Sequence, residues 1–338
     1  KESFTLFPKL RFKEFDGDWL KLKYKDVLTI RYGKDHKSLN DGDIPVYGTG
    51  GLMRHVNKYL YDGESILIGR KGTIDKPKYI NEKFWTVDTL FYTEIEESIV
   101  PLFLYQHALE VNWLGLNEAT GVPSLNTTSI YNIDISIPSK EEQTKIASFL
   151  SAVDEKISQL TKKHELLSQY KQGMMQKLFS QQVRFKADDG SEFGEWDQLK
   201  FKDVIKIKYG KDHKKLDDGD IPVLGTGGVM RYVDSYLYEG ESILIGRKGT
   251  IDKPRFISGK FWTVDTLFYT EIGEKILPKF AFQQLLLVNW LNLNEATGVP
   301  SLNTTSIGNI ELKVPCLAEQ TKIANVLSAI DQKIEVVS

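Results

Sequence analysis

Cysteine is almost absent from this sequence, with Cys316 the single one among 338 residues. A lone cysteine excludes an intramolecular disulfide and a zinc site built from thiolates, so a reducing compartment is expected. Long apolar runs are missing as well, because no window approaches eighteen consecutive apolar residues. The sequence begins at Lys1, without an initiator Met and without the basic-then-apolar pattern of a signal peptide. We therefore expect a soluble, cytoplasmic protein with no membrane partner, whose first residue was trimmed.

A strong net charge is also lacking. Lys and Arg number 44 against 46 Asp and Glu, a formal charge of −2, which excludes a histone-like polycation. The hydrophobic fraction of 41% and the charged fraction of 27% are those of a globular protein. The length favours two domains of ordinary size over one.

Motifs of catalysis are missing too. Neither Gly48-Thr49-Gly50-Gly51 nor any other glycine-rich stretch forms a P-loop, and no Asn/Asp-Pro-Pro-aromatic tetrad of an amino-methyltransferase occurs. His36 has no second His or Cys at ligand spacing, so no metal site is predicted. Asp41-Gly42-Asp43 favours a turn over a nuclease metal site, because turns select aspartate and glycine. We predict no catalytic residue in this chain, which indicates a binding protein.

An internal repeat organises the sequence. Tyr32-Gly33-Lys34-Asp35-His36-Lys37 recurs 177 residues later, beginning at Tyr209, and this offset holds without a gap from Trp19 to Ile157. Between residues 32–95 and 209–272, 52 of 64 positions are identical. A period this long indicates a tandem duplication of one domain and not a solenoid, whose units are several-fold shorter.

Each copy alternates short β-branched and aromatic runs with turn signals. Residues 44–47, 59–61, 65–68, 84–87 and 89–93 predict strands joined by hairpins, and residues 101–114 have the apolar spacing of a helix. Each copy is therefore expected to be a mixed α and β domain with a strand-rich half.

A coiled-coil seam follows each copy. Apolar residues spaced 4, 3, 4, 3 run from Ile146 to Leu178, interrupted by His164 and Lys171, and the second seam begins in the same way. The alternative, a helix lying on its own domain, is less favoured, because about 40 residues at about 1.5 Å each make a rod of roughly 60 Å. The predicted seam residues are Ile146, Leu150, Val153, Ile157, Leu160, Leu167, Ile323, Leu327, Ile330 and Ile334.

The simplest partner for one seam is the other. We predict an α+β protein in which two tandem strand-rich mixed domains are separated by long helices that form an antiparallel coiled coil with an approximate twofold axis. The expected boundaries are residues 1–139, a central helix at 140–182, residues 183–316, and a shorter C-terminal helix at 317–338.

The strongest binding motif is a basic loop. Ser65 to Pro77 runs from a strand into a glycine-flanked basic turn, recurs identically from Ser242 to Pro254, and carries a local charge of +3 over residues 66–78. Glycines let backbone amides approach a phosphate, and arginine can contact a guanine edge with two hydrogen bonds. The alternative for this loop is a solvated turn with ordinary surface lysines. A second basic cluster surrounds His36 and Arg54. The predicted DNA-binding residues are Lys34, His36, Arg54, Arg70, Lys71 and Lys76 in the first copy, with Lys211, His213, Arg231, Arg247, Lys248 and Lys253 in the second.

A third repeated motif, Asn117 to Ile130, returns as Asn294 to Ile307. Its amides and hydroxyls could contact a phosphate backbone. They could equally cap helices and form turns, and this second interpretation is favoured.

In order, these motifs resemble the specificity subunit of type I restriction-modification systems. The resemblance rests on Leu10-Arg11-Phe12 and Val183-Arg184-Phe185, on the Gly-Arg-Lys-Gly loop, on Ala119 to Asn126, and on Glu142 to Ala147. It covers nearly the whole chain and several of the motifs occur twice.

The resemblance implies a non-catalytic, sequence-specific DNA-recognition subunit with two target-recognition domains. It implies partners: double-stranded DNA, two methyltransferase subunits that use S-adenosylmethionine, and a restriction and translocase subunit that uses ATP and Mg²⁺. It implies no cofactor in this chain. From the repeat and the approximate twofold axis we expect a bipartite target whose half-sites are inverted repeats or nearly so. The alternative is a coiled-coil adaptor that binds only proteins, and a stand-alone nuclease or methyltransferase lacks its motifs.

Overall fold

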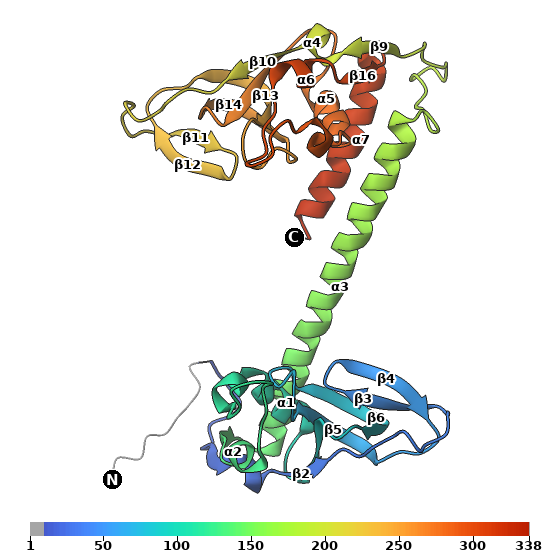
Figure 1. The fold of residues 1–338 in the computed structure, drawn as a ribbon, viewed down its shortest axis with the longest axis vertical. Coiled ribbons are helices and arrows are strands. Elements are labelled where there is room, and N and C mark those ends of the chain that lie inside the picture. The colour runs from blue at the N-terminus through green and yellow to red at the C-terminus, as the bar shows by residue number, and fades with distance from the viewer. Residues whose placement is uncertain (1–9, 338) are drawn as a thin grey trace. The chain divides into compact units, whose positions relative to one another are not determined.

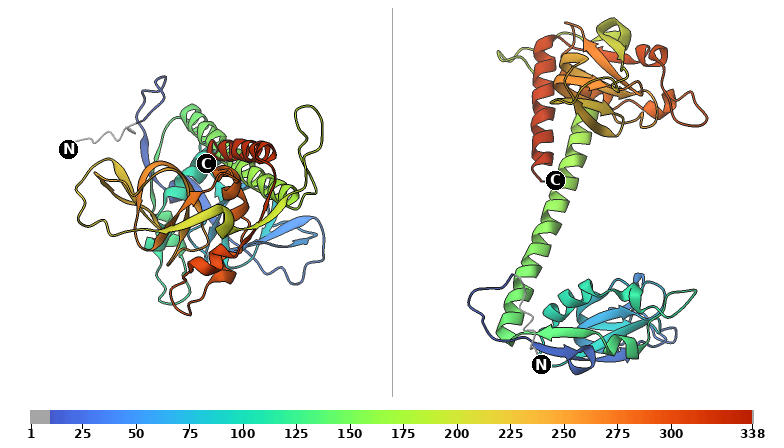
Figure 2. Two further views of the ribbon diagram at one scale, coloured as in Figure 1. Left: turned by 90° about the horizontal axis from the view of Figure 1, so that it is seen from above. Right: turned by 90° about the vertical axis from the view of Figure 1, so that its left-hand side faces the viewer.

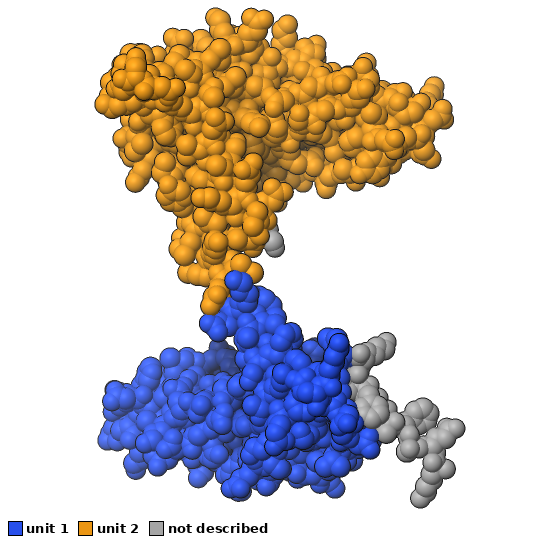
Figure 3. All heavy atoms as spheres, turned by 180° about the vertical axis from the view of Figure 1, so that it is seen from behind, with its two compact units in different colours: residues 1–158 blue, residues 159–338 orange. Residues whose placement is uncertain are grey.

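The structure is a computed structural model that describes residues 10–337. The chain forms two compact units, residues 1–158 (unit 1) and residues 159–338 (unit 2), coloured separately in Figure 3. Each unit is a strand-rich mixed domain, and the long helix α3 (Lys140–Phe179) begins in unit 1 and ends in unit 2 (Figure 1). The predicted pair of tandem strand-rich domains with a long helix between them is confirmed. No helix of residues 10–337 combines the length and apolar character needed to span a membrane.

Unit 1 is built on a six-stranded sheet in the order β2-β7-β5-β6-β3-β4. Neighbouring strands are antiparallel except β3 and β6, where Val46 pairs in parallel with Trp85. The strands are β2 (Leu28–Tyr32), β3 (Ile44–Gly48), β4 (Gly51–Val56), β5 (Tyr61–Gly69), β6 (Lys78–Thr86) and β7 (Leu90–Ile95).

Helices cover one face of this sheet. They are α1 (Pro101–Glu110), a 3-10 turn at Trp113–Leu116 and α2 (Thr127–Tyr131), so the helix expected at residues 101–114 breaks after Glu110. Ile66, Ile68 and Phe91 from the strands pack against Phe103 and Trp113 to form the core. A smaller apolar cluster, with Leu67 and Phe84 at its centre, lies elsewhere on the same strands because strand side chains alternate between faces.

A second, two-stranded sheet positions the start of α3. Strand β1 (Leu20–Lys23), followed by a 3-10 turn at Tyr24–Asp26, pairs antiparallel with β8 (Asp134–Ile137). Arg11 donates two hydrogen bonds of 2.7 Å to the buried carboxylate of Glu142, in the first turn of α3. The next residue, Gln143, accepts from the backbone of Val100 at 2.8 Å and donates to two carbonyls. The repeated Glu-Gln pair therefore fixes the helix to its domain.

Unit 2 repeats this plan. Its six-stranded sheet has the order β10-β15-β13-β14-β11-β12, and β16 pairs with β9. The elements are β9 (Asp197–Lys200), α4 (Phe201–Val204), β10 (Ile205–Tyr209), β11 (Ile221–Gly225), β12 (Gly228–Val233), β13 (Tyr238–Gly246), β14 (Arg255–Thr263), β15 (Leu267–Ile272), α5 (Pro278–Leu285), a 3-10 turn at Trp290–Leu293, α6 (Thr304–Gly308), β16 (Glu311–Val314) and α7 (Leu317–Glu335).

Within unit 2, the end of α3 runs antiparallel to α7, as the views of Figures 1 and 2 agree. The Lys171 ammonium lies 2.6 Å from the Asp331 carboxylate, and Arg184, just after α3, binds Glu319 at the start of α7. The later residue, Arg184, thus pairs with the earlier residue of α7, Glu319, as an antiparallel arrangement requires. Met175 and Leu178 of α3 share a core with Ile323, Leu327 and Ile330 of α7, joined by the partly buried Ile334.

Candidate nucleic-acid interface

The basic loop leaves strand β5 through Gly69. A Cβ atom on Gly69 would overlap the carbonyl oxygen of Thr73, and Gly72 has φ of +92°, a conformation that side chains rarely adopt. Both glycines are thus required for the tight loop that presents Arg70 and Lys71. The matching glycines of unit 2, Gly246 and Gly249, meet the same constraints.

Two other segments hold this loop in place. The backbone amides of Arg70 and Lys71 donate to the carbonyl of Thr89 at 2.8 and 3.2 Å, and the amide of Gly72 donates to Pro123 at 2.9 Å. The amide of Leu125 donates back to the Arg70 carbonyl at 2.9 Å. In unit 2 the four equivalent hydrogen bonds recur with the same lengths. The repeated Asn117–Ile130 motif therefore holds the basic loop through backbone hydrogen bonds.

The side chains of this third motif are used in caps and turns. Asn117 accepts from the amides of Ala119 and Ser124 at 3.1 and 2.9 Å, and Asn126 caps α2 through the amide of Ser129 at 2.7 Å. The capping interpretation is confirmed by these hydrogen bonds.

The Arg70 guanidinium is held in one direction. Its Nη1 donates to the Asp88 carbonyl at 2.9 Å, and its Cζ lies over the Tyr32 ring, 5.5 Å from the centroid. Arg247 repeats the arrangement, with Asp265 at 3.0 Å and the Tyr209 ring at 5.5 Å. Among residues 10–337 the remaining guanidinium donors of both arginines have no hydrogen-bond partner, so they are available to a ligand. Sequence reasoning missed Tyr32 and Tyr209 as arginine supports, although both open the repeated motif that contains Lys34 and Lys211.

A shallow pocket lies beside the loop in each unit. In unit 1 it is lined by Asp35, His36 and Lys37, by the turn from Gly48 to Met53, and by Val87 to Thr89. A Cβ on Gly72 would lie 3.5 Å from the Thr49 hydroxyl, which places the pocket next to the basic loop. The pocket of unit 2 has the same lining except that Val229 replaces Leu52. The structure thus brings His36, Arg70 and Lys71, and their counterparts in unit 2, to one neighbourhood.

Among the predicted DNA-binding residues, the exposed lysines are Lys34, Lys71 and Lys76, with Lys211, Lys248 and Lys253 in unit 2. Lys34 is positioned through its backbone, because its carbonyl accepts from the Trp85 indole at 2.8 Å and its amide donates to Thr86 at 2.8 Å. These lysines supply positive charge that can contact phosphates.

Arg54 has a different setting. Its Nη2 lies 2.5 Å from the Asp41 carboxylate and donates to the Leu39 carbonyl at 3.3 Å, so it ties strand β4 to the loop before β3. Arg231 forms the same pair with Asp218 at 2.7 Å. Both arginines are therefore already committed to acidic partners.

His36 and His213 stand next to these loops. The Nδ1 atom of each is buried without a hydrogen-bond partner among the described residues. In that part of the chain no group of three His, Cys, Asp or Glu side chains could hold a metal ion.

One pair of substitutions between the units is coupled. The Tyr47 hydroxyl donates to Glu82 at 2.6 Å, and burial together with this carboxylate raises the pKa of Tyr47 to about 12. In unit 2 the equivalent positions are Leu224, which is buried, and Gly259. Because the differences at Tyr47 and Glu82 are coupled to each other, the exposed differences left on this hairpin are Leu52 against Val229 and His55 against Tyr232, on β4 and β12, followed by the exposed Asn57 and Asp234.

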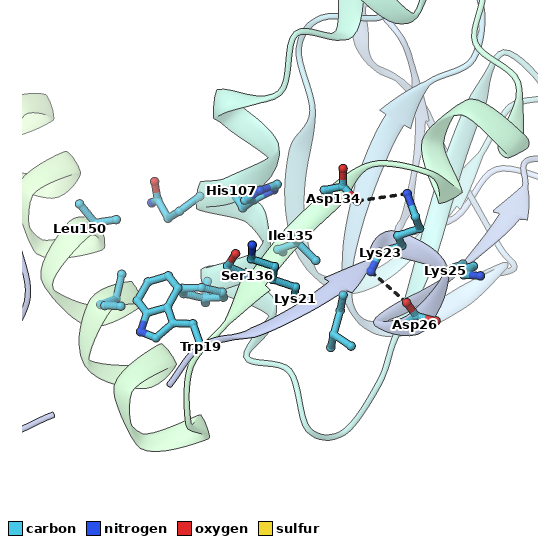
Figure 4. A pocket seen from close by; sticks show the side chains of 14 residues that line it. Trp19, Lys21, Lys23, Lys25, Asp26, His107, Asp134, Ile135, Ser136 and Leu150 are labelled. Carbon is cyan, nitrogen blue, oxygen red and sulfur yellow. Dashed lines mark hydrogen bonds and ion pairs between the residues drawn. The ribbon is translucent and has the colours of Figure 1, made fainter. Parts of the chain in front are cut away.

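The predicted seam residues fall into three settings. In unit 1, Ile146 packs on the domain core and Leu150 lines a groove beside it (Figure 4). Val153 and Ile157 are exposed, while Leu160 and Leu167 are half-buried. In unit 2, Ile323, Leu327 and Ile330 are buried against the end of α3, and Ile334 packs at its edge.

Comparison with known proteins gives one consistent family. A model described as the type I restriction modification DNA specificity domain matches residues 16–168 and 194–337, one match in each copy. The type I restriction enzyme MjaVIII specificity subunit of Methanocaldococcus jannaschii is 28% identical over 82% of this chain and 72% of its own length. The putative MjaX specificity subunit of the same organism is 27% identical over 98% of this chain and 91% of its own.

A solved structure has the same fold. The S subunit of the type I restriction-modification system from M. genitalium superposes with a TM-score of 0.75 at 17% identity, covering 98% of this chain and 94% of that one. At this identity the likeness concerns the fold.

Proposed function

The chain belongs to the family of type I restriction-modification DNA specificity subunits, a non-catalytic family that recognises DNA target sequences, and we propose that each unit reads one half of a bipartite target with its basic loop. The observation that carries this proposal is the duplicated support of Arg70 and Arg247. Each guanidinium is fixed by a tyrosine ring and a carbonyl and keeps free donors, which is the arrangement needed for a bidentate contact with a guanine edge.

The two half-sites should be nearly the same sequence. The loops and pockets that would meet DNA are identical at almost every position, so they offer the same hydrogen-bonding groups. Copies that address the two strands of a duplex read inverted repeats, as half-site symmetry follows protein symmetry in dimeric DNA-binding proteins. The exposed difference between His55 and Tyr232 is the most direct source of asymmetry.

Lys34, Lys71, Lys76 and their counterparts in unit 2 would contact phosphates around these base contacts. His36 and His213, which line the shallow pockets, would contact the same DNA segment. We assign Arg54 and Arg231 to shaping the hairpin instead, because both are bound to acidic side chains.

Members of this family bind DNA as part of a restriction-modification complex. We propose that this chain docks two methyltransferase subunits through exposed residues of α3, including Val153 and Ile157. S-adenosylmethionine would be bound by those subunits, and ATP and Mg²⁺ by a restriction subunit. An adaptor that binds only proteins is not favoured, since the family recognises DNA.

The test is DNA binding by the assembled complex carrying Arg70→Ala and Arg247→Ala. Each lost base contact should cost about 1–3 kcal/mol and relax specificity at one position of each half-site. If the arginines hold phosphates instead, affinity falls on all sequences and the salt slope drops by about one per contact.

The matched control is Arg31→Ala with Lys208→Ala, which also removes two positive charges, from β2 and β10, where Arg31 pairs with Glu94 at 2.8 Å and Lys208 with Glu271 at 3.2 Å. It should leave both affinity and specificity unchanged. An arginine double variant that binds with the affinity, specificity and salt slope of the parent would overturn the site.

A further inference from the structure

The hairpin of β3 and β4 carries two exposed apolar side chains just after its turn (Figure 1). Leu52 and Met53 are each 56% exposed, and their counterparts on β12, Val229 and Met230, are 52% and 59% exposed. We call each pair the apolar tip of its unit. Single exposed apolar residues are common on protein surfaces and need no explanation. Two adjacent ones that recur at equivalent positions of both domains indicate a contact surface.

A β-bulge creates the apolar tip. In unit 1, Tyr47 pairs with Leu52 while the preceding residue of β3 pairs with Arg54, so Met53 has no partner in the register. Unit 2 has the same shift, at Met230. Strand side chains normally alternate between the two faces of a sheet, and a bulge changes the direction of the side chain that it inserts. The bulge therefore allows two successive residues of the strand to be exposed.

The methionine of each apolar tip lies over a glycine. A Cβ atom on Gly48 would lie 2.8 Å from the Met53 sulfur, and one on Gly225 would lie 2.9 Å from the Met230 sulfur. A side chain at either glycine would therefore push the methionine aside. The glycine keeps the thioether beside the turn, although more than half of each methionine stays exposed.

The apolar tip shares a pocket with the segment that holds the basic loop. Both residues of the tip line the shallow pocket of unit 1, together with Asp88 and Thr89. The Asp88 carbonyl accepts from Nη1 of Arg70 at 2.9 Å, and the Thr89 carbonyl accepts from the backbone amides of Arg70 and Lys71. Unit 2 repeats this arrangement. A ligand bound to the remaining donors of Arg70 would therefore lie next to the apolar tip.

The groups that line this pocket suit bases better than phosphates. They include the carboxylates of Asp35 and Asp88 and the ammonium of Lys37, and the buried Nδ1 of His36 has no hydrogen-bond partner among the described residues. Carboxylates repel a phosphate but accept hydrogen bonds from the amino groups of bases. The major groove of DNA displays hydrogen-bond donors, acceptors and the methyl group of thymine, and it admits a two-stranded β ribbon. The apolar tip is the part of this surface that fits the methyl group.

We propose that Met53 and Met230 each contact the C5 methyl group of one thymine in the major groove, beside the base that the neighbouring arginine reads. Leu52 and Val229 would flank this contact. The inference rests on the proposed reading of DNA by the basic loop and adds an apolar contact to it. Because methionine stands at both positions, the same thymine is expected in both half-sites. Met53 and Met230 are thus specificity-determining residues.

The probe is duplex DNA that the assembled complex selects from a library of randomised sequence. Each thymine of the selected half-sites is then replaced in turn by deoxyuridine, which lacks only the methyl group. At one thymine of each half-site this replacement should lower affinity about fourfold, the equivalent of uncovering one buried methyl group. The hydrogen-bonding groups of the base are unchanged, so the loss isolates the apolar contact.

Met53→Ala with Met230→Ala locates the contact on the chain. The variant complex should bind the thymine and the uracil duplexes with equal affinity, while it keeps the parent's preference for guanine. Leu109→Ala with Leu286→Ala is the matched control, because both leucines are exposed and neither lines the pocket. This control should keep the fourfold ratio. Far-ultraviolet circular dichroism checks that each variant chain is folded.

Three outcomes would overturn the proposal. The first is a set of half-sites in which no thymine is sensitive to the replacement. The second is a fourfold ratio that persists in Met53→Ala with Met230→Ala, which would assign the methyl group to another part of the complex. The third is increased 2-aminopurine fluorescence in the bound DNA that the methionine variant abolishes, without any difference between thymine and uracil. That result would make the apolar tip a wedge between base steps.

A failure of the proposed function gives a different result. If the basic loop does not read bases, Arg70→Ala with Arg247→Ala selects the same sequences as the parent. The ratio of thymine to uracil affinity is still measured on those sequences, with and without the two methionines. If the arginine variant loses the preference for guanine and no thymine is sensitive, the methyl contact alone is wrong.

Discussion

Unit 1 and unit 2 have nearly identical basic loops but differ in how the long helix α3 packs in each of them. The basic loops, the pockets beside them and their hydrogen bonds are repeated almost atom for atom, although residues 32–95 and 209–272 differ at 12 of 64 positions. In unit 2 the end of α3 packs against Ile323 and Leu327 of α7, whereas in unit 1 Val153 and Ile157 of α3 are exposed among the described residues. Duplication has thus kept the parts that present hydrogen-bond donors nearly unchanged, while the packing of α3 differs between the two units.

The strongest way to separate the two units is to remove the buried glutamate of each. Glu319 binds Arg184 and also accepts from the Trp196 indole at 3.0 Å, whereas Glu142 binds Arg11 and the Trp19 indole nitrogen has no partner among residues 10–337. Glu319→Ala should lower the free energy of unfolding by about 3 kcal/mol, and Glu142→Ala by less. This loss of about 3 kcal/mol is at the low end of the range for breaking a buried ion pair, because the Arg184 side chain is 20% exposed.

Urea denaturation followed by tryptophan fluorescence measures both variants. Glu192→Ala, which removes an exposed partner of Lys186, is the control and should unfold like the parent. Equal losses for Glu142→Ala and Glu319→Ala would show that the Trp196 hydrogen bond adds nothing.

A smaller difference lies at one position of the first long helix of each domain, where unit 1 has His107 and unit 2 has Gln284. Burial lowers the pKa of His107, an effect that nearby Glu110 partly opposes, and its Nδ1 lies 3.0 Å from the Tyr24 hydroxyl. The His107 imidazole therefore binds a proton more readily in the unfolded chain than in the folded one. Stability from the neutral imidazole is therefore complete above a pH of about 6.5 and is lost as the pH falls through the lowered pKa.

His107→Gln, which copies the residue of unit 2, should flatten this pH dependence. Denaturation of the parent and the variant at pH 7.5 and pH 5.5 measures the change. If both proteins lose the same stability between these values, His107 is not the group that titrates.

The smallest effect is expected on the exposed part of α3. The Ile157 side chain is 56% exposed, so Ile157→Asp should change the free energy of unfolding by no more than about 0.5 kcal/mol. A large loss of thermal stability would show that this part of the predicted seam is buried in the protein in solution.

Local patterns predicted most of the fold. The repeat, the strands between residues 44 and 93 and the long helix from residue 140 follow from spacing and turn residues, because each is specified by its own segment. The support of Arg70 by Pro123, Leu125 and Tyr32 joins segments more than thirty residues apart, and no period in the sequence encodes it. Arg54 shows the same limit: its charge suggested DNA contact, while Asp41, thirteen residues earlier, already neutralises it.

Mapping the methylated adenines in DNA exposed to the assembled complex tests the duplicated reading surface most directly. Two units with nearly identical loops predict a bipartite target whose halves are inverted repeats, or differ at single positions, on either side of an unread spacer. Two unrelated half-sites would contradict the shared reading surface, and a continuous target without a spacer would contradict the assignment of one half-site to each unit.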